Sequence, residues 1–319
     1  MIEVNNLRKE FGNFVAVDSI SLSVNQGEVL GFLGPNGAGK STTMKMITGF
    51  LSPTAGSISV CGHDVASDAI AAKTVIGYLP EGAPAYPDMT PKAFLNFVAE
   101  IRGFRGIDKQ QRIDAAIEKT NLASVANKAI DTLSKGFKRR VGIAQAIMHD
   151  PKVLVMDEPT DGLDPNQKHE VRELIRAMAK EKSIIISTHI LEEVHAVCSR
   201  AIIIAQGKLL FNGTPAELES RSRYHNAVSM LLATDQPGET ASLLQKIANV
   251  SQVEMHTLPD GLVRYTLMPK DGKSIIKDAS RYALEHELDI KELGLEAGRL
   301  DEVFRTITTG SGDRQEALT

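Results

Sequence analysis

One short glycine-rich segment constrains the fold of this chain more than any other part of its sequence. Residues 34–42, Gly-Pro-Asn-Gly-Ala-Gly-Lys-Ser-Thr, match the pattern G-x-x-x-x-G-K-[ST] at every fixed position. The segment follows the apolar run Val29 to Leu33, and a buried strand, a glycine-rich loop and a helix form the context that this pattern requires. The sequence therefore predicts an α/β fold organised around a phosphate-binding loop.

The residues of this loop suit the phosphates of a nucleotide. Glycines let successive backbone N–H groups turn inward around phosphate oxygens, and the N-terminus of the following helix adds partial positive charge. Lys40 would bring a full charge to the β and γ phosphates, and the hydroxyl of Ser41 would bind Mg²⁺. An ordinary glycine turn, the alternative, does not explain the lysine, the hydroxyl and the preceding strand together. The candidate nucleotide-binding residues are Gly34, Pro35, Asn36, Gly37, Ala38, Gly39, Lys40, Ser41 and Thr42.

A second apolar run ends in two carboxylates. Val153 to Met156 has the composition of a buried strand and is followed directly by Asp157 and Glu158. The segment resembles a Walker B strand, and this resemblance implies that Asp157 would hold Mg²⁺ through water and that Glu158 would lie on the γ-phosphate side and polarise the attacking water. An apolar strand that ends in Asp-Glu is common by itself, but it becomes specific when it follows a phosphate-binding loop.

Taken in chain order, these motifs resemble the ATP-binding subunits of ABC transporters from the N-terminus to about Pro215. The acidic strand is similar to the family's Walker B strand. Residues 133–137, Leu-Ser-Lys-Gly-Phe, resemble the family's signature Leu-Ser-Gly-Gly-Gln, with Lys135 in place of the first glycine and Phe137 in place of the glutamine. In the family, this segment begins a helix whose N–H groups reach the γ-phosphate bound by the opposite subunit. The resemblance implies that Ser134, a suitable N-cap, and Gly136 bind nucleotide in trans.

The same resemblance assigns roles to four more residues. Phe11 lies where the family has an aromatic that stacks on adenine. Glu81 stands where the family usually has a glutamine that senses Mg²⁺, so it is a candidate contact for nucleotide and metal that adds charge to the site. Asp164 resembles the main residue of the D-loop, which crosses the dimer interface in the family. His189 resembles the switch histidine that hydrogen-bonds the γ-phosphate, which makes His189 and Glu158 the candidate catalytic pair.

A metal site is a competing interpretation of the segment around the switch histidine. Four possible ligands are close together in sequence: His189, Glu192, Glu193 and His195. His189 is expected to end a strand, whereas the other three are expected on the next helix. We therefore disfavour a metal site, and a surface position is the more frequent fate of His195.

Composition and charge limit the other classes of function. A basic run follows the signature serine and could suggest nucleic acid: Lys135, Lys138, Arg139 and Arg140. A net charge of -4 argues against a dedicated nucleic-acid binder, so we expect no nucleic-acid partner and interpret the run as a solvated helix face. Cys61 and Cys198 lie far apart outside any C-x-x-C spacing, which fits a reducing cytosol.

The sequence also predicts where the protein resides. It contains no secretory signal at its start, and no apolar run approaches the ~18 residues that a membrane span needs. If the chain is part of a transporter, its membrane portion is another polypeptide. We expect a cytoplasmic protein that is peripheral on the inner face of the cell membrane.

Strand and helix patterns alternate over the first two thirds of the chain, as in a sandwiched α/β core. We expect an ABC-type P-loop NTPase domain over residues 1–218. A helical subdomain that faces the permease in the family is expected over about 82–133, and it includes a helix capped by Thr90 with Pro91 in its first turn. The proline-rich stretch Gly82 to Met89 is the expected coupling surface.

The character of the sequence changes after Pro215, where the motor motifs stop. Ala227 to Ala233 and Ile290 to Leu295 are patterned as strands, and two helices and two further strands are expected between them. This is a ferredoxin-like order. We expect a small α+β accessory domain over 219–309, closed by a helix that begins near Leu300, and a flexible tail over 310–319. No catalytic constellation lies here, so regulation, dimer support or partner docking are its expected roles.

The leading interpretation is an ATPase subunit that dimerises around two molecules of Mg²⁺-ATP and energises a separate membrane permease. The dimer would be a homodimer or a pseudo-dimer. The variant signature, Glu81 and the C-terminal domain most resemble bacterial ABC-2-type export systems, including the gliding-motility-associated subgroup. The transported substrate is not specified, because selectivity resides in the permease.

Two other functions remain as alternatives. One is a soluble ABC-type ATPase that acts on ribosomes or DNA. Its relatives usually carry two motor domains in one chain or split their motor with long coiled coils, and neither feature is present. The other is a degenerate ATP sensor, which only Glu81 and Lys135 support, whereas Lys40, Asp157 and Glu158 are intact.

Overall fold

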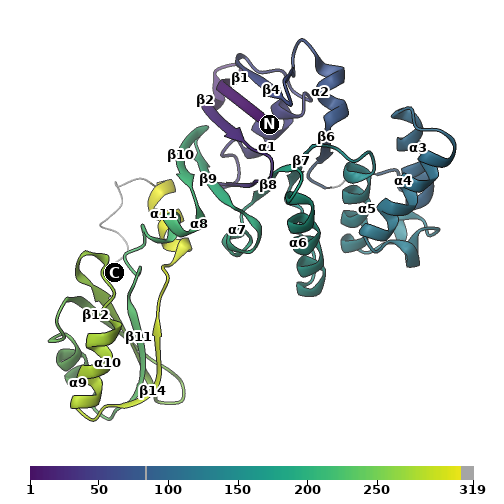
Figure 1. Ribbon diagram of the computed structural model, residues 1–319. Coiled ribbons are helices and arrows are strands. Elements are labelled where there is room, and N and C mark those ends of the chain that lie inside the picture. The colour runs from purple at the N-terminus through teal and green to yellow at the C-terminus, as the bar shows by residue number, and fades with distance from the viewer. Residues whose placement is uncertain (83–84, 310–319) are drawn as a thin grey trace. The chain divides into compact units, whose positions relative to one another are not determined.

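The computed structural model describes residues 1–82 and 85–309, and its contacts divide the chain into two compact units, Met1–Gly213 and Thr214–Thr319 (Figure 1). The division precedes the boundary expected at residue 218 because helix α8 (Pro215–Glu219) packs against helix α11 (Leu300–Thr309) of the second unit. The tail expected over 310–319 and residues 83–84 of the expected coupling surface lie outside the described residues.

The first unit is built on a sheet of six strands in the order β10-β9-β3-β8-β7-β6. The strands β3, β6, β7, β8 and β9 pair in parallel, and β10 pairs antiparallel with β9. All residues of β3, β7 and β8 are buried, which explains their continuous apolar runs. The strands are β3 (Val29–Leu33), β6 (Ile76–Leu79), β7 (Val153–Asp157), β8 (Ser183–Thr188), β9 (Arg200–Ala205) and β10 (Lys208–Gly213).

The parallel pairing places the candidate site. In open α/β sheets, ligands bind beyond the carboxyl ends of the strands. The glycine-rich loop follows β3, the Asp157-Glu158 pair ends β7, and His189 follows β8. Because β3, β8 and β7 are adjacent and parallel, these three segments meet at the same edge of the sheet.

A second, antiparallel sheet of the first unit has the order β2-β1-β4-β5. Helix α1 (Lys40–Ile47), which follows the glycine-rich loop, contacts strands of both sheets. Its Met44 and Ile47 share one hydrophobic core with Ile2 of β1 and Phe32 of β3. The strands are β1 (Ile2–Phe11), β2 (Phe14–Val24), β4 (Ala55–Val60) and β5 (His63–Asp64), and helix α2 (Ala69–Val75) leads into β6.

Helices α3 (Pro91–Ile101), α4 (Gly106–Lys119) and α5 (Lys135–Ile147) form a helical part of this unit with a hydrophobic core of its own (Figure 1). The Thr90 hydroxyl accepts a hydrogen bond from the Ala93 N–H at 3.2 Å, so the expected cap is present. The connections include the short turns η1 (Ala123–Val125) and η2 (Ile130–Thr132), and helices α6 (Pro165–Ala179) and α7 (Leu191–Val197) follow β7 and β8.

The second unit has the strand and helix order that its sequence predicts. Its antiparallel sheet has the order β12-β13-β11-β14, as expected for a ferredoxin-like domain. Tyr265 and Leu232 of the sheet and Leu244 and Ala279 of the helices share its core. The elements are β11 (Val228–Ala233), α9 (Pro237–Leu244), β12 (Val250–Thr257), β13 (Val263–Pro269), η3 (Lys270–Gly272), α10 (Ile276–Glu285) and β14 (Asp289–Leu295). The predicted fold class is confirmed.

Within the described part of the chain, none of the helices combines the length and the apolar character that crossing a bilayer requires.

Candidate functional site

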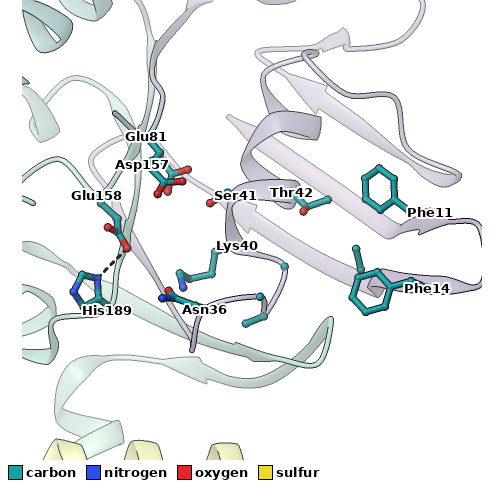
Figure 2. A pocket seen from close by; sticks show the side chains of 14 residues that line it. Phe11, Phe14, Asn36, Lys40, Ser41, Thr42, Glu81, Asp157, Glu158 and His189 are labelled. Carbon is teal, nitrogen blue, oxygen red and sulfur yellow. Dashed lines mark hydrogen bonds and ion pairs between the residues drawn. The ribbon is translucent and has the colours of Figure 1, made fainter. Parts of the chain in front are cut away.

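A cavity of ≈ 620 Å³ opens beside the glycine-rich loop (Figure 2). It brings together residues from the β1–β2 hairpin, the loop and the start of α1, the segment after β6, and the ends of β7 and β8. The lining residues are Phe11, Phe14, Ala16, Asn36, Gly37, Ala38, Gly39, Lys40, Ser41, Thr42, Glu81, Asp157, Glu158 and His189. Most residues that the sequence proposes for nucleotide, metal and catalysis therefore share one cavity.

Five residues of the predicted site do not line this cavity: Gly34, Pro35, Ser134, Gly136 and Asp164. The first two belong to the loop itself, and their carbonyls accept hydrogen bonds from Lys40. The other three are the residues that the sequence assigns to the opposite subunit or the dimer interface. Their role in trans stays a prediction.

The shape of the loop depends on its glycines. Gly39, at the N-cap of α1, has φ of 106°. A Cβ on Gly39 would lie 2.6 Å from the Ala16 carbonyl oxygen, and one on Gly34 would lie 2.3 Å from that of Ile204. A side chain at either position would therefore displace backbone.

The ammonium of Lys40 lies inside the loop. The side chain is 6% exposed, and its Nζ donates to the carbonyls of Gly34 at 2.6 Å and Pro35 at 3.1 Å. Burial lowers the pKa of Lys40, and the charges of Glu158 and the neighbouring carboxylates oppose that shift. The cation is thus held between the loop and the carboxylates at the end of β7.

The oxygen donors around Asp157 fit a divalent cation. Asp157 is 2% exposed, and its Oδ1 accepts a hydrogen bond from the Ser187 hydroxyl. Its Oδ2 is buried and has no hydrogen-bond partner among the described residues. Glu81 and Ser41 line the same cavity. Figure 2 shows the carboxylates of Asp157 and Glu81 directed into it. Carboxylate and hydroxyl oxygens are the ligands that Mg²⁺ prefers, and Asp157 has an oxygen free to serve it.

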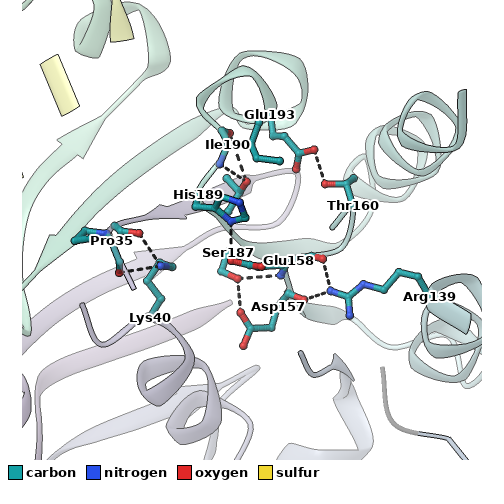
Figure 3. A network of polar contacts seen from close by, with 12 residues as sticks. Pro35, Lys40, Arg139, Asp157, Glu158, Thr160, Ser187, His189, Ile190 and Glu193 are labelled. Carbon is teal, nitrogen blue, oxygen red and sulfur yellow. Dashed lines mark hydrogen bonds and ion pairs between the residues drawn. The ribbon is translucent and has the colours of Figure 1, made fainter. Parts of the chain in front are cut away.

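The candidate catalytic residues contact each other directly. Glu158 Oε1 lies 2.9 Å from His189 Nδ1 (Figure 3). Glu158 has a left-handed backbone with φ of 49°, and its N–H donates to the Ser187 hydroxyl at 3.0 Å. Ser187 of β8 thus holds the backbone of Glu158 as well as the side chain of Asp157. The pair could share a proton and present the histidine's other nitrogen to a phosphate.

The predicted signature segment begins helix α5. The Ser134 hydroxyl accepts from the Phe137 N–H at 3.4 Å, which makes Ser134 the N-cap. A Cβ on Gly136 would lie 2.2 Å from Oε1 of Gln167 in α6, so a larger residue would require the end of the Gln167 side chain to shift. Asp164 is the N-cap of α6 and accepts from the Gln167 N–H at 2.9 Å. Ser134 and Asp164, the two predicted interface residues with polar side chains, therefore each cap a helix of their own chain.

Phe14 and Ala16 line the cavity, although the sequence patterns do not predict them. Phe14 pairs with Phe11 across the β1–β2 turn, and both aromatic side chains are exposed. Phe14 could have been predicted beside Phe11 from the sequence, because the two aromatics flank the two-residue Gly12-Asn13 turn and a tight hairpin sets such residues opposite each other.

The interpretation of the basic run as a solvated helix face is wrong for two of its members. Arg139 is 6% exposed and Arg140 is 8% exposed. Arg140 pairs with Glu170 of α6 at 2.8 Å, and Arg139 binds backbone carbonyls near the end of β7 (Figure 3). Arginine can be buried in this way because its fork of donors is satisfied by fixed acceptors.

Glu193, one of the possible metal ligands, has a different partner. It is 1% exposed, and its carboxylate accepts a hydrogen bond from the Thr160 hydroxyl (Figure 3). Arg172 of α6 lies 3.4 Å from the same oxygen. His189 instead pairs with Glu158. Within residues 1–82 and 85–309, no three His, Cys, Asp or Glu side chains are grouped so as to hold a metal ion.

Comparison with known proteins gives one family model and several relatives. The family model described as "ABC transporter" matches residues 17–161. The linearmycin resistance ATP-binding protein LnrL of Bacillus subtilis (strain 168) is 30% identical over 309 residues, which cover 97% of this chain and 98% of the relative. The probable multidrug ABC transporter ATP-binding protein YbhF of Escherichia coli (strain K12) is 38% identical over 223 residues, 70% of this chain but 38% of YbhF.

Solved structures resemble part of the chain. A structure described as the ATP binding subunit of an ABC transporter covers 69% of this chain and 92% of that chain, with a TM-score of 0.64 and 29% identity. The structure of cbiO1 from Clostridium perfringens, described as part of the ABC transporter complex cbiONQ, has a TM-score of 0.63 and 28% identity. Because the similarity to LnrL extends over nearly both full lengths, this chain belongs to the ABC transporter ATP-binding proteins.

Proposed function

We propose that the chain is the ATP-hydrolysing subunit of an ABC transporter, and that it pairs with a second copy and drives a separate membrane permease. The observation that carries this proposal is the single cavity that collects the glycine-rich loop, Lys40, Asp157, Glu158 and His189. Such a set supplies phosphate binding, metal binding and water activation, which are the components that phosphoryl transfer to water requires.

Nucleotide binding would begin at the loop. Its N–H groups and the N-terminus of α1 would hold the phosphates, and the ammonium of Lys40 would move from the loop carbonyls to the β and γ phosphates. Phe11 and Phe14 extend the cavity away from the loop, where an aromatic surface suits adenine. An aromatic surface accepts any nucleobase, so the choice of ATP follows from the family to which the chain belongs.

Ser41, Asp157 and Glu81 would hold Mg²⁺ beside those phosphates. The ion supplies charge neutralisation at the β and γ oxygens when it is bound. Asp157 offers its Oδ2, which has no hydrogen-bond partner among the described residues, while Ser187 keeps the other oxygen in place. Glu81 adds a carboxylate where a glutamine is usual in the family, so we expect it to strengthen cation binding.

Glu158 would act as the general base. Its carboxylate would take a proton from the water that attacks the γ-phosphate. Because His189 Nδ1 contacts this carboxylate, Nε2 is the nitrogen left to face a γ-phosphate oxygen, and a ring with a proton on both nitrogens would donate to the carboxylate and to the phosphate together. Glu158 and His189 thereby have separate roles, one toward the water and one toward the phosphate.

The site would be completed by the opposite subunit. Ser134 and Gly136 begin α5, where N–H groups and the helix dipole favour an anion, yet they do not line the chain's own cavity. Asp164 begins α6 and would cross the interface. Closure of the dimer on ATP and its reopening after hydrolysis would then drive the permease.

Export is the direction that we favour, in a system of the ABC-2 type and the gliding-motility-associated subgroup. The relatives' names include linearmycin resistance, multidrug and Nod factor export proteins, and these names describe those proteins. The chain would be peripheral on the inner face of the cell membrane, held there by its permease. A soluble ATPase acting on ribosomes or DNA has no support from the relatives' names.

Two experiments test this proposal. The Glu158→Gln variant should bind ATP but hydrolyse it roughly 10²- to 10⁴-fold more slowly, because the base is lost. Hydrolysis near the normal rate would exclude Glu158 as the base. The tagged full chain, purified from detergent-solubilised membranes of its own cells, should recover an integral membrane protein in a fixed ratio. Recovery of ribosomes or DNA without a membrane protein would contradict the transporter function.

A further inference from the structure

Arg139 is a buried charge whose partners are backbone carbonyls. It lies in α5, in the turn after the signature segment, and it is 6% exposed. Within the described part of the chain it forms no ion pair, and its donors contact the carbonyls of Pro80, Asp157, Glu158 and Pro159. We call this set of contacts the carbonyl clamp.

The carbonyl clamp joins three segments that are distant in sequence. Pro80 directly precedes Glu81, and its carbonyl accepts from Arg139 Nη1 at 3.2 Å. The Asp157 and Glu158 carbonyls both accept from Nη2, and the Pro159 carbonyl accepts from Nε at 3.4 Å. Figure 3 shows the guanidinium extending from α5 to the end of β7. The start of the signature helix is therefore bound to both carboxylate-bearing segments of the site.

The backbone at Glu158 explains why such a clamp is needed. Its left-handed φ of 49° turns two successive carbonyls toward the same guanidinium nitrogen. This conformation costs about 1 kcal/mol or more for a residue with a Cβ, so it persists only where contacts hold it. A guanidinium can satisfy converging acceptors with a rigid fork, whereas the single ammonium of a lysine cannot match that geometry.

We propose that Arg139 is a positioning residue that couples the signature helix to Glu158 and Glu81. The proposal rests on the proposed function, because it concerns the same catalytic site. When α5 moves to meet a nucleotide in the opposite subunit, the guanidinium moves with it and carries the carbonyls of Pro80 and Asp157–Pro159. The water-activating carboxylate thus reaches its working position only when the signature helix is in place.

Arg140 provides a matched control. It is the next residue of the same helix and is equally buried, but its guanidinium pairs with Glu170 of α6 at 2.8 Å and lies 5.6 Å from the ring centre of Phe137. Among the described residues, no hydrogen bond or ion pair joins Arg140 to β7. A substitution that merely disturbs packing around α5 should therefore act similarly at positions 139 and 140.

The experiment compares full-length Arg139→Lys, Arg139→Gln and Arg140→Lys with the unchanged chain. The readouts are kcat and KM for ATP, the dissociation constant for Mg²⁺-ATP by calorimetry, and the thermal unfolding midpoint. Arg139→Lys should lower kcat roughly 10- to 100-fold, because small displacements of a catalytic group have effects of that size. Its ATP affinity should stay within about threefold, and Arg140→Lys should keep kcat within about threefold.

Three outcomes decide the proposal. A loss of kcat confined to position 139, with ATP affinity retained, supports it, even if Arg139→Gln fails to fold. A kcat of Arg139→Lys within about twofold of normal overturns it, and so does an equal loss in Arg140→Lys. An unchanged chain that hydrolyses no ATP, alone or with its permease, would overturn the proposed function instead, so the two failures are distinguishable.

Discussion

Replacement of Thr160 by valine tests the buried contact between the segment that follows β7 and helix α7. Thr160 is 2% exposed, and its hydroxyl donates to the carboxylate of Glu193, which is 1% exposed. Valine has nearly the shape of threonine but no hydroxyl. Among the described residues, this oxygen of Glu193 would keep Arg172 as its donor, at 3.4 Å. The substitution therefore removes a donor from a buried charge without opening a cavity.

The expected cost follows from the charge and the burial. A hydrogen bond to a charged group contributes about 1.5–3 kcal/mol, so we expect Thr160→Val to lower the free energy of unfolding of the first unit by about 2 kcal/mol. For a unit of this size, that loss corresponds to a fall of roughly 4–8 °C in the unfolding midpoint. Thr160→Ser is the control, because it keeps the hydroxyl and loses one methyl group, at about 0.8 kcal/mol.

The assay is urea unfolding of the full chain with and without Mg²⁺-ATP. Two units need not unfold in one transition, so each transition is fitted separately. The transition that ATP shifts to higher urea belongs to the unit that binds ATP. We expect the valine variant to lose about 1 kcal/mol more than the serine variant in that transition. A valine variant as stable as the serine variant would refute the buried hydrogen bond.

Three further predictions concern other parts of the chain. Burial lowers the pKa of His149 from 6.5 to about 4, so the unfolded chain binds a proton at this residue before the folded chain does as the pH falls. The free energy of unfolding should therefore drop by about 2 kcal/mol between pH 7 and pH 5. His149→Gln should remove that drop, as measured by urea unfolding at each pH. Glu81→Gln should weaken Mg²⁺ binding in the presence of ATP by about tenfold, measured by metal titration, and an unchanged affinity would exclude Glu81 from the metal site. Tyr265→Phe removes the hydroxyl that donates to the Pro237 carbonyl at 2.9 Å and should destabilise the second unit by about 1 kcal/mol without changing ATP turnover.

Local patterns were enough to predict the parts of the fold that each segment determines for itself. The apolar run before Gly34 is a wholly buried strand because a parallel sheet covers both of its faces. Asp157 ends β7 and His189 follows β8, and the parallel pairing of β7, β8 and β3 brings both residues to the edge of the sheet where the glycine-rich loop lies. The order of strands and helices in the second unit was predictable in the same way, since alternation and turn residues mark each element.

The features that the sequence did not predict depend on contacts between segments that are distant in the chain. Nothing near Arg139 in sequence indicates that it is buried, because its acceptors are carbonyls of residues 80 and 157–159. Charged residues in a helix are usually solvated. For that reason Arg140 was expected on a solvated helix face, and no feature of the sequence indicated that Glu193 is buried. The division of the contacts after Gly213 also depends on distant segments, because α8 packs against a helix that begins at Leu300.

The solution mass of the full-length Glu158→Gln variant, measured with and without Mg²⁺-ATP, tests the central claim most directly. Without ATP we expect one 34.6 kDa chain, and with ATP a particle of two chains, because a variant that cannot hydrolyse ATP should keep the dimer closed. Ser134 and Gly136 would then bind the nucleotide of the opposite subunit, although Lys135 and Phe137 depart from the family's signature sequence. A mass that stays at one chain under saturating Mg²⁺-ATP would contradict closure by this chain alone.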